Sequence, residues 1–326
     1  MSAAHIPTKQ ATPADPANFS LDQQLLQRRF AASAASCDEA DPLSREVSRR
    51  MDERLDYIRL EPQRILDLGC GNGADLSTLQ ARYPQALVIG ADFALPRLQR
   101  ARPQQPPRPQ KLLKRLFSTP SSLPSLPLVS ADAARLPFAY QSFDLLWSNL
   151  LLASIDDPRP ILREMQRCLR VGGLLMFSTL GPDTLQELRT VLPARTGSRV
   201  HRFIDMHDLG DALVDTGFAD PVMDMEKLTL TYGELDRLFA DLRGSGAANA
   251  ASDRPRGLSG RQGWAQARAA YEALRDAGRL PVSIEIVQAH AWKAEPKTVA
   301  DGRSIVHFQP RQPRQPQRTG PADKAS

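Results

Sequence analysis

Short apolar runs alternate with amphipathic stretches through the first half of the chain. The stretches 76–82 and 160–169 are predicted to be helices. Strands that alternate with helices in this rhythm predict a parallel sheet covered by helices on both faces. The runs with the length of buried strands are 64–68, 86–91, 128–130, 143–148 and 174–178.

The two ends of the chain follow a different pattern. From 21 to 60 the pattern predicts helices, with Leu43, Val47, Met51 and Leu55 spaced four apart on one face. Residues 282–292 alternate between apolar and polar side chains and predict the last strand of the sheet. The other elements expected beyond Gly181 are helices at 184–191 and 207–216, a strand at 223–232, and a helical stretch at 235–277 interrupted at 244–263.

Proline and polar content set the expected domain boundaries. The chain has 326 residues, 41% of them apolar, which is enough for one large α/β domain with embellishments. Seven of its 27 prolines fall within 102–128, which is predicted to be a basic insert without regular structure. The predicted organisation is a disordered N-terminus at 1–20, a domain at 21–294 with a lid or substrate region at 181–280, and a disordered tail at 295–326.

Positive charge is concentrated outside the expected core. The net charge is +5, yet no acidic residue lies between Asp92 and Asp132, an interval that holds seven basic residues. Phe117 is the only aromatic residue between Lys111 and Asp132, and base stacking needs aromatic side chains. Nucleic-acid binding is therefore not predicted. The basic interval fits either a solvated loop or a docking site for an acidic partner.

Cysteine usage and hydropathy indicate the compartment. Cys37, Cys70 and Cys168 lack metal-ligand spacing and are interpreted as reduced thiols, so no metal site is expected. The chain has no run of 18 or more apolar residues, and its first twenty residues lack the apolar stretch of a secretory signal. We therefore expect a cytoplasmic protein that does not bind membranes. A monomeric state is a further expectation.

The glycine cluster in ILDLGCGNG carries the most specific chemistry of the sequence. Asp67 ends a predicted strand and is followed by Gly69, Gly71 and Gly73. Glycine suits a sharp strand-to-helix turn where a ligand lies against the main chain. Dinucleotide-binding folds use G-x-G-x-x-G with amides aimed at a pyrophosphate. An acidic residue two positions before G-x-G-x-G suits a cationic ammonium group instead, which favours S-adenosylmethionine over NAD.

Polar residues also follow the later strands. Asp92 lies 19 residues after Gly73 and is placed to accept hydrogen bonds from both ribose hydroxyls. Asp132 is placed to accept a hydrogen bond from the adenine amino group, and Asn149 is placed to form the floor of the methionine pocket. Each alone is typical of a turn or a helix cap, but all fall at the carboxyl ends of strands, where ligands bind in such sheets. The predicted cofactor-binding residues are Asp67, Gly69, Cys70, Gly71, Gly73, Asp92, Phe93, Asp132, Ala133 and Asn149.

The segment from Phe30 to Lys293 resembles class I methyltransferases, and within them the malonyl-acyl-carrier-protein O-methyltransferases of biotin synthesis. Matching stretches include RRFAASAASCDEADPLSREV, ILDLGCGNG and ARLPFAYQSFDLLWSNL, and the more restricted ones are FSTLGPDTLQELR and FIDMHDLGDAL. The resemblance implies an α/β fold with a doubly wound, mostly parallel, Rossmann-like sheet of seven strands. It also implies an antiparallel last strand, a helical lid from segments before 65 and after 181, and malonyl-acyl carrier protein as partner.

Two places depart from the family pattern. Cys37 stands where the family has a tyrosine in its N-terminal helix. Ala153 and Ser154 stand where the family has an aromatic residue beside a hydrogen-bonding one. Because these positions belong to the cofactor and substrate pocket of the family, the departures are expected to affect substrate choice or activity.

A carboxylate acceptor makes modest chemical demands. It is ionised at pH 7, so its methylation needs no general base, only alignment with the sulfonium methyl and exclusion of water. An arginine that binds the far oxygen of the carboxylate provides this alignment. Arg189, Arg202 and Arg243 in the lid segments are the candidates, and a surface-charge role is the alternative for each. No residue is assigned a catalytic role.

Other functions fit parts of the same sequence. Methylation of another small-molecule or protein acceptor uses the same cofactor site. An arginine hydroxylase similar to complex I assembly factors shares the DLRGSG stretch, and a non-catalytic S-adenosylmethionine-binding protein is compatible with the two departures. The function that we expect is methyl transfer from S-adenosylmethionine to malonyl-acyl carrier protein.

Overall fold

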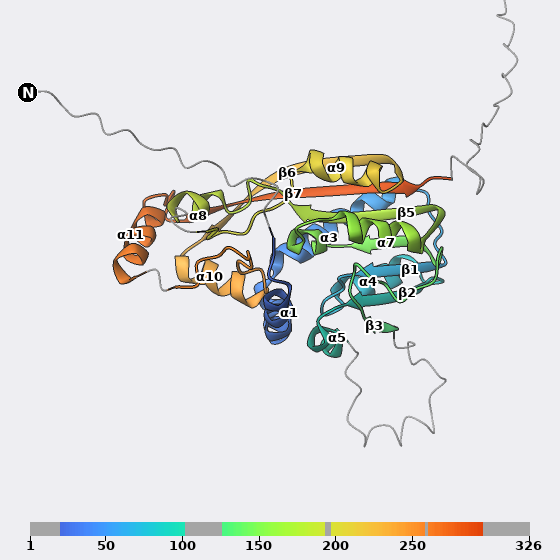
Figure 1. The fold of residues 1–326 in the computed structure, drawn as a ribbon, viewed down its shortest axis with the longest axis horizontal. Helices are drawn as coiled ribbons and strands as arrows, with labels where there is room; N and C mark the ends of the chain where they lie inside the picture. The colour runs from blue at the N-terminus through green and yellow to red at the C-terminus, as the bar shows by residue number, and fades with distance from the viewer. Residues whose placement is uncertain (1–19, 102–125, 193–196, 258–259, 296–326) are drawn as a thin grey trace, which may run out of the picture. The chain divides into compact units, whose positions relative to one another are not determined.

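The computed structural model describes residues 20–101, 126–192, 197–257 and 260–295. They form a seven-stranded sheet in the order β3-β2-β1-β4-β5-β7-β6 (Figure 1). Strands β1 to β5 pair in parallel, and β7 runs antiparallel to both of its neighbours. The predicted doubly wound, mostly parallel α/β sheet is confirmed. The strands are β1 (Arg64–Leu68), β2 (Leu87–Asp92), β3 (Leu128–Ser130), β4 (Phe143–Ser148), β5 (Leu169–Leu180), β6 (Phe218–Tyr232) and β7 (Leu280–Lys293).

Helices connect and cover these strands, and the predicted helical segments all form. Within the described ranges, no helix has both the length and the apolar content to cross a membrane. The α-helices are α1 (Gln23–Ala32), α2 (Cys37–Ala40), α3 (Pro42–Arg54), α4 (Ala74–Arg82), α5 (Leu95–Ala101), α7 (Arg159–Cys168), α8 (Gln186–Val191), α9 (Met206–Asp215), α10 (Leu235–Gly244) and α11 (Arg261–Glu272). The 3₁₀ turns η2 (Ser33–Ala35), η3 (Leu55–Tyr57) and η4 (Leu151–Ser154) join them.

Two apolar cores lie on the opposite faces of the sheet. Alternation along a strand sends Leu145 into one core and Leu146 into the other. Val47 and Met51 of α3 fill the first core, as their helical spacing predicts. Helix α9 lies along β6 and β7 on the second face (Figure 1). Each fully buried aliphatic side chain contributes about 1.5–3 kcal/mol, so the sheet is a rigid platform for the loops at its edge.

The N-terminal segment and the region around the end of α10 pack on each other and form what we call the lid, residues 20–41 and 235–251. Asp22 N–H donates to the carbonyl oxygen of Ala250 over 2.9 Å. Ser36 Oγ donates to the carbonyl oxygen of Gly244 over 3.0 Å. These contacts join segments more than 200 residues apart in the sequence. The lid or substrate region at 181–280 stays a prediction.

Several boundaries differ from the prediction. Strand β5 begins at Leu169, five residues before the predicted start at 174, and it ends at Leu180 and not at 178. Strand β6 begins at Phe218 and not at 223, because its first residues continue the pairing with β7 across a register shift between Ala219 and Val222. Pro221 within this stretch hides the strand in the sequence. The predicted strand at 128–130 is confirmed as β3, so Leu128, which the predicted insert at 102–128 also included, belongs to the sheet. The carbonyl of Pro127 accepts from Gly90 N–H over 3.0 Å.

Several predicted segments cannot be compared with the structure. Residues 102–125 of the insert lie outside the described residues. So do the predicted disordered segments 1–20 and 295–326, apart from Ser20 and Glu295.

Candidate functional site

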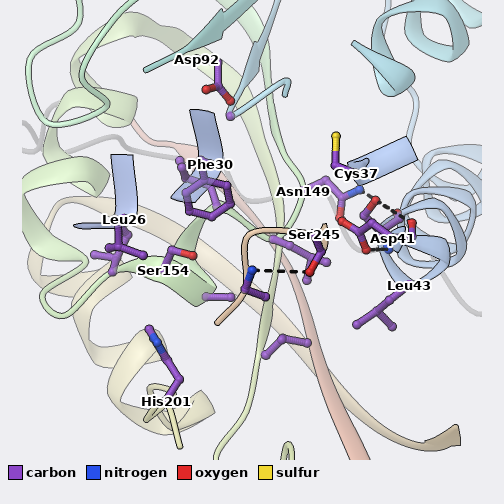
Figure 2. A pocket seen from close by; sticks show the side chains of 18 of the residues that line it. Leu26, Phe30, Cys37, Asp41, Leu43, Asp92, Asn149, Ser154, His201 and Ser245 are labelled. Carbon is purple, nitrogen blue, oxygen red and sulfur yellow. Dashed lines mark hydrogen bonds between the residues drawn. The ribbon is translucent and has the colours of Figure 1, made fainter. Parts of the chain in front are cut away.

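A cavity of about 710 Å³ lies at the carboxyl ends of the central parallel strands and extends under the lid. Its wall combines residues at the ends of β1, β2 and β4 with residues of α1 and α10. Figure 2 shows Asp92 and His201 at opposite ends of the view, with Phe30 and Ser154 between them. The cavity is therefore an elongated space that runs from the glycine loop to the lid.

The glycine loop has the backbone that its sequence predicts. Gly69, Gly71 and Gly73 all have positive φ, at 82°, 53° and 80°. A Cβ added at Gly69 would lie 3.1 Å from a carbon of Leu151, so a larger residue there meets both strain and a close contact. Gly73 is the N-cap of α4. The loop thus turns sharply from β1 into α4 with its backbone near the cavity.

Asp92, the last residue of β2, accepts hydrogen bonds from the backbone of two neighbouring loops. Its side chain is 6% exposed. Oδ2 accepts from Gly71 N–H over 3.0 Å, and Oδ1 accepts from Ala94 N–H over 2.7 Å. Burial raises the pKa of this carboxyl, while the two amide hydrogen bonds and the nearby Arg97 oppose that shift. Asp92 lines the cavity, so each oxygen keeps a lone pair for a hydroxyl-bearing ligand.

A group of buried carboxyls surrounds the loop. Asp67 is 1% exposed, and its Oδ2 has no hydrogen-bond partner among the described residues. Burial, together with the charges of Asp75 and Asp92, raises its pKa well above the ordinary value. Asp75 lies in the first turn of α4 and lines the cavity. Three acidic groups this close together favour a cationic ligand.

Asn149 joins the end of β4 to the N-terminal helices. Its Nδ2 donates to the carbonyl oxygen of Ser44 over 2.9 Å and to Asp75 Oδ2 over 3.2 Å. Its Oδ1 accepts from Ser178 Oγ over 2.9 Å. The next residue, Leu150, has a φ of 58°, which is unusual for leucine. These bonds fix the wall of the cavity at the point where the methionine pocket is predicted.

The structure brings most of the predicted cofactor residues together. The Asp67 carboxyl and the backbone of Gly71 and Gly73 support the wall from behind instead of lining it. Asp132 is exposed and caps its own turn by accepting from Ala134 N–H over 2.9 Å. Burial raises the pKa of the Cys70 thiol, so this side chain is a neutral thiol at pH 7 and not a nucleophilic thiolate. The predicted residues that line the cavity are Gly69, Cys70, Asp92, Phe93, Asp132, Ala133 and Asn149.

None of the three predicted substrate-orienting arginines lines the cavity in the described part of the chain. Arg189 donates to the carbonyl oxygens of Pro182, Thr184 and His201, so its guanidinium holds the backbone of the segment after β5. Arg202 and Arg243 are exposed. The described arginines that do line the cavity are Arg45 and Arg97, which the sequence analysis did not single out as site residues.

The two family departures also lie in the wall. Cys37, at the start of α2, is buried, and burial raises the pKa of its thiol. Ala153 and Ser154 of η4 line the part of the cavity that also contains His201. The departures therefore change the surface that a substrate meets.

His201 is a buried histidine that sequence reasoning missed as a site residue. It is 6% exposed and lines the cavity. Burial lowers its pKa from 6.5 to about 4, so it is neutral at pH 7. No sequence motif marks this position, because its burial results from tertiary packing.

Stability between pH 4 and 6.5 is expected to depend on His201. In this window the unfolded chain binds a proton at His201 and the folded chain does not, so stability falls as pH falls. The shift corresponds to a loss of about 3 kcal/mol at the acid end. Replacing His201→Gln should remove this part of the pH dependence. Urea unfolding of both proteins at pH 5 and 7.5 tests it, and an unchanged difference between the two pH values would contradict it.

Comparison with known proteins agrees with this geometry. Residues 66–177 match a family model described as a methyltransferase domain. The chain is 47% identical over 299 residues to a malonyl-[acyl-carrier protein] O-methyltransferase of Laribacter hongkongensis, a match that covers 90% of this chain and 98% of that relative. A protein with the same description from Legionella pneumophila is 36% identical over 279 residues, 85% of this chain and 93% of that relative.

A solved structure supports the fold. A crystal structure from Bacillus halodurans, described as a methyltransferase, has a TM-score of 0.51 with this chain at 14% identity. The match covers 77% of this chain and all of that one. At this level of identity the likeness concerns the fold alone.

Proposed function

The chain belongs to the family of malonyl-[acyl-carrier protein] O-methyltransferases, and we propose that it transfers a methyl group from S-adenosylmethionine to the free carboxylate of a malonyl group on acyl carrier protein. The observation that carries the proposal is that the chain is similar in sequence to these relatives and also has a cavity lined by the predicted cofactor residues. Relatives of this description align with 85–90% of the chain. Gly69, Asp92 and Asn149, three of the predicted cofactor residues, line one cavity that extends under the lid.

The residues of the cavity fit the methyl donor. The Asp75 and Asp92 carboxyls line the cavity. The buried Asp67 carboxyl lies close to them, its Oδ2 lacks a hydrogen-bond partner among the described residues, and a cationic ligand would favour its ionised form. Such a site suits a ligand that carries an ammonium and a sulfonium group. Asp92 would accept from the ribose hydroxyls, and Asn149 would border the methionine part. When bound, S-adenosylmethionine supplies an electrophilic methyl group.

The protein's own contribution is positioning. The malonyl carboxylate is already ionised at neutral pH, so no side chain has to remove a proton. A carboxylate oxygen forms the new bond to the methyl carbon as the carbon–sulfur bond breaks, which yields a methyl ester and S-adenosylhomocysteine. The lid excludes water, and the fixed wall at Asn149 holds the reacting groups in line.

The cellular setting is part of the proposal. Acyl carrier protein is the proposed partner, and the methyl ester is proposed to enter biotin synthesis. The structure has free, buried cysteines at positions 37, 70 and 168. A cytoplasmic location and a monomeric state stay predictions of the sequence.

A labelled-methyl assay tests the proposed function. Purified protein incubated with methyl-labelled S-adenosylmethionine and malonyl-acyl carrier protein should transfer the label to the carrier fraction, in a base-labile ester. Acetyl-acyl carrier protein is the matched control, because it has the same carrier and thioester but no free carboxylate. Equal labelling of both, or of neither, would show that the malonyl carboxylate is not the acceptor.

A further inference from the structure

Arg97 makes an unusual set of contacts between the cofactor loop and the lid. It lies in α5, five residues after Asp92, and is half-buried. Its Nε donates to the carbonyl oxygen of Phe30 over 3.1 Å. Its Nη2 donates to Ser33 Oγ and to the carbonyl oxygen of Ser245, each over 2.6 Å. One guanidinium therefore binds both segments of the lid.

The acceptors are suited to a cation. Phe30 lies in the last turn of α1, and Ser245 is the C-cap of α10. Carbonyls at helix C-termini lack intrahelical partners and carry the negative end of the helix dipole. The guanidinium carbon of Arg97 also lies 4.6 Å from the centre of the Phe30 ring. A planar group with several donors can make these contacts together, which lysine cannot.

The lid backbone is built to come close to this guanidinium. Gly246 follows Ser245 and has a φ of 85°. A Cβ at Gly246 would lie 3.0 Å from Phe30 Cδ1 and from Ser33 Oγ, and 3.2 Å from Arg97 Nη2. Only a glycine fits here without pushing the two lid segments and Arg97 apart.

The other side of Arg97 faces the cofactor loop. Its Nη1 lies 3.7 Å from the position that a Cβ would take at Gly71, whose N–H is bound by Asp92. The rings of Phe30 and Phe93 meet edge to face at 5.6 Å between centroids, which forms a second link between lid and loop. Arg97, Asp92, Phe93, Phe30 and Ser245 all line the cavity.

We propose that Arg97 is a positioning residue that couples the cofactor loop to the lid, so that an occupied loop and a closed lid stabilise each other. The proposal rests on the proposed function only for the identity of the cofactor, and it does not depend on the acceptor. A ligand bound at Asp92 stabilises the glycine loop through the Gly71 N–H bond to Asp92. Arg97, which lies beside this loop, then holds α1 and the end of α10 against it. In return, the closed lid slows release of the bound nucleoside.

Variants on both sides of the contact test the coupling. Arg97→Ala removes the guanidinium from the loop side, and Gly246→Ala separates the lid from it while Arg97 stays in place. Gly260→Ala is the matched control, because Gly260 also has positive φ (71°) but nothing lies within 4 Å of its added Cβ. Arg28→Ala controls for loss of an exposed arginine from α1.

Two measurements on the full chain report the coupling. Calorimetry with S-adenosylhomocysteine should show at least tenfold weaker binding for Arg97→Ala and Gly246→Ala, and parental binding for both controls. Trypsin cleavage after Arg28 or Arg29 should be slowed by S-adenosylhomocysteine in the parent and in Gly260→Ala. In Arg97→Ala and Gly246→Ala the ligand should give little protection even at saturating concentration.

Chemical rescue separates positioning from a merely structural role. Methylguanidinium should restore much of the affinity of Arg97→Ala and none of that of Gly246→Ala, because only the first leaves a space for it. Parental affinity and full ligand protection in Arg97→Ala would overturn the proposal. So would a loss of affinity in Arg97→Ala that methylguanidinium does not reverse. If the parent itself fails to bind S-adenosylhomocysteine, it is the proposed function that fails.

Discussion

Asp92→Ala is expected to weaken binding of S-adenosylmethionine and S-adenosylhomocysteine at least 100-fold. The carboxylate faces the cavity and is placed to accept two ribose hydroxyls. Hydrogen bonds to a charged group contribute about 1.5–3 kcal/mol each, and 1.4 kcal/mol corresponds to a factor of ten. The substitution also leaves the N–H groups of Gly71 and Ala94 without their acceptor, which loosens the glycine loop.

Calorimetry on Asp92→Ala and Asp92→Asn measures this effect. Asparagine keeps one oxygen but presents an NH₂ group to Gly71 or Ala94 N–H, so it should restore little affinity. Asp132→Ala is the matched control, because Asp132 is an exposed cavity carboxylate that bonds within its own turn. Its effect should be tenfold or less. Parental affinity in Asp92→Ala would remove the ribose assignment.

Much of the fold follows from local patterns. The alternation that sends Leu145 and Leu146 to opposite faces, and the four-residue spacing of Val47 and Met51, are visible in the sequence and hold in the structure. The late predicted start of β6 comes from proline. Pro221 lies inside β6 beside a register shift, so this segment resembles a loop although its backbone pairs in the sheet.

The residues of the candidate site also differ in how far local sequence predicts them. Gly69, Asp92 and Asn149 were predictable because each follows a strand, and the carboxyl ends of parallel strands share one edge of the sheet. Arg97 and His201 were not, because the lid contacts of Arg97 and the burial of His201 arise only when the chain folds. The lid arginines show the opposite error. Sequence position placed Arg189 near a substrate, but its donors are taken by backbone carbonyls.

Asp67→Asn is expected to flatten the pH dependence of stability and to weaken binding of S-adenosylhomocysteine. The folded-state pKa of Asp67 is raised by burial and by Asp75 and Asp92. Between the ordinary pKa of an aspartate and the raised folded-state pKa, the unfolded chain has lost this proton and the folded chain retains it. The ligand-free protein therefore loses stability as pH rises, by up to about 1.4 kcal/mol per pH unit. Asparagine does not titrate, so the variant should show a flatter dependence between pH 5 and 8.

Binding of two ligands to Asp67→Asn tests whether Asp67 acts on the ammonium group. If Asp67 acts on the ammonium group, Asp67→Asn should weaken S-adenosylhomocysteine at least tenfold and leave 5′-methylthioadenosine, which lacks the amino-acid part, almost unchanged. Asp92→Ala should weaken both ligands, because both contain the ribose. Thermal unfolding at several pH values and calorimetry with the two nucleosides measure these effects. Equal losses for both ligands in Asp67→Asn would mean that Asp67 supports the loop and does not act on the ammonium group.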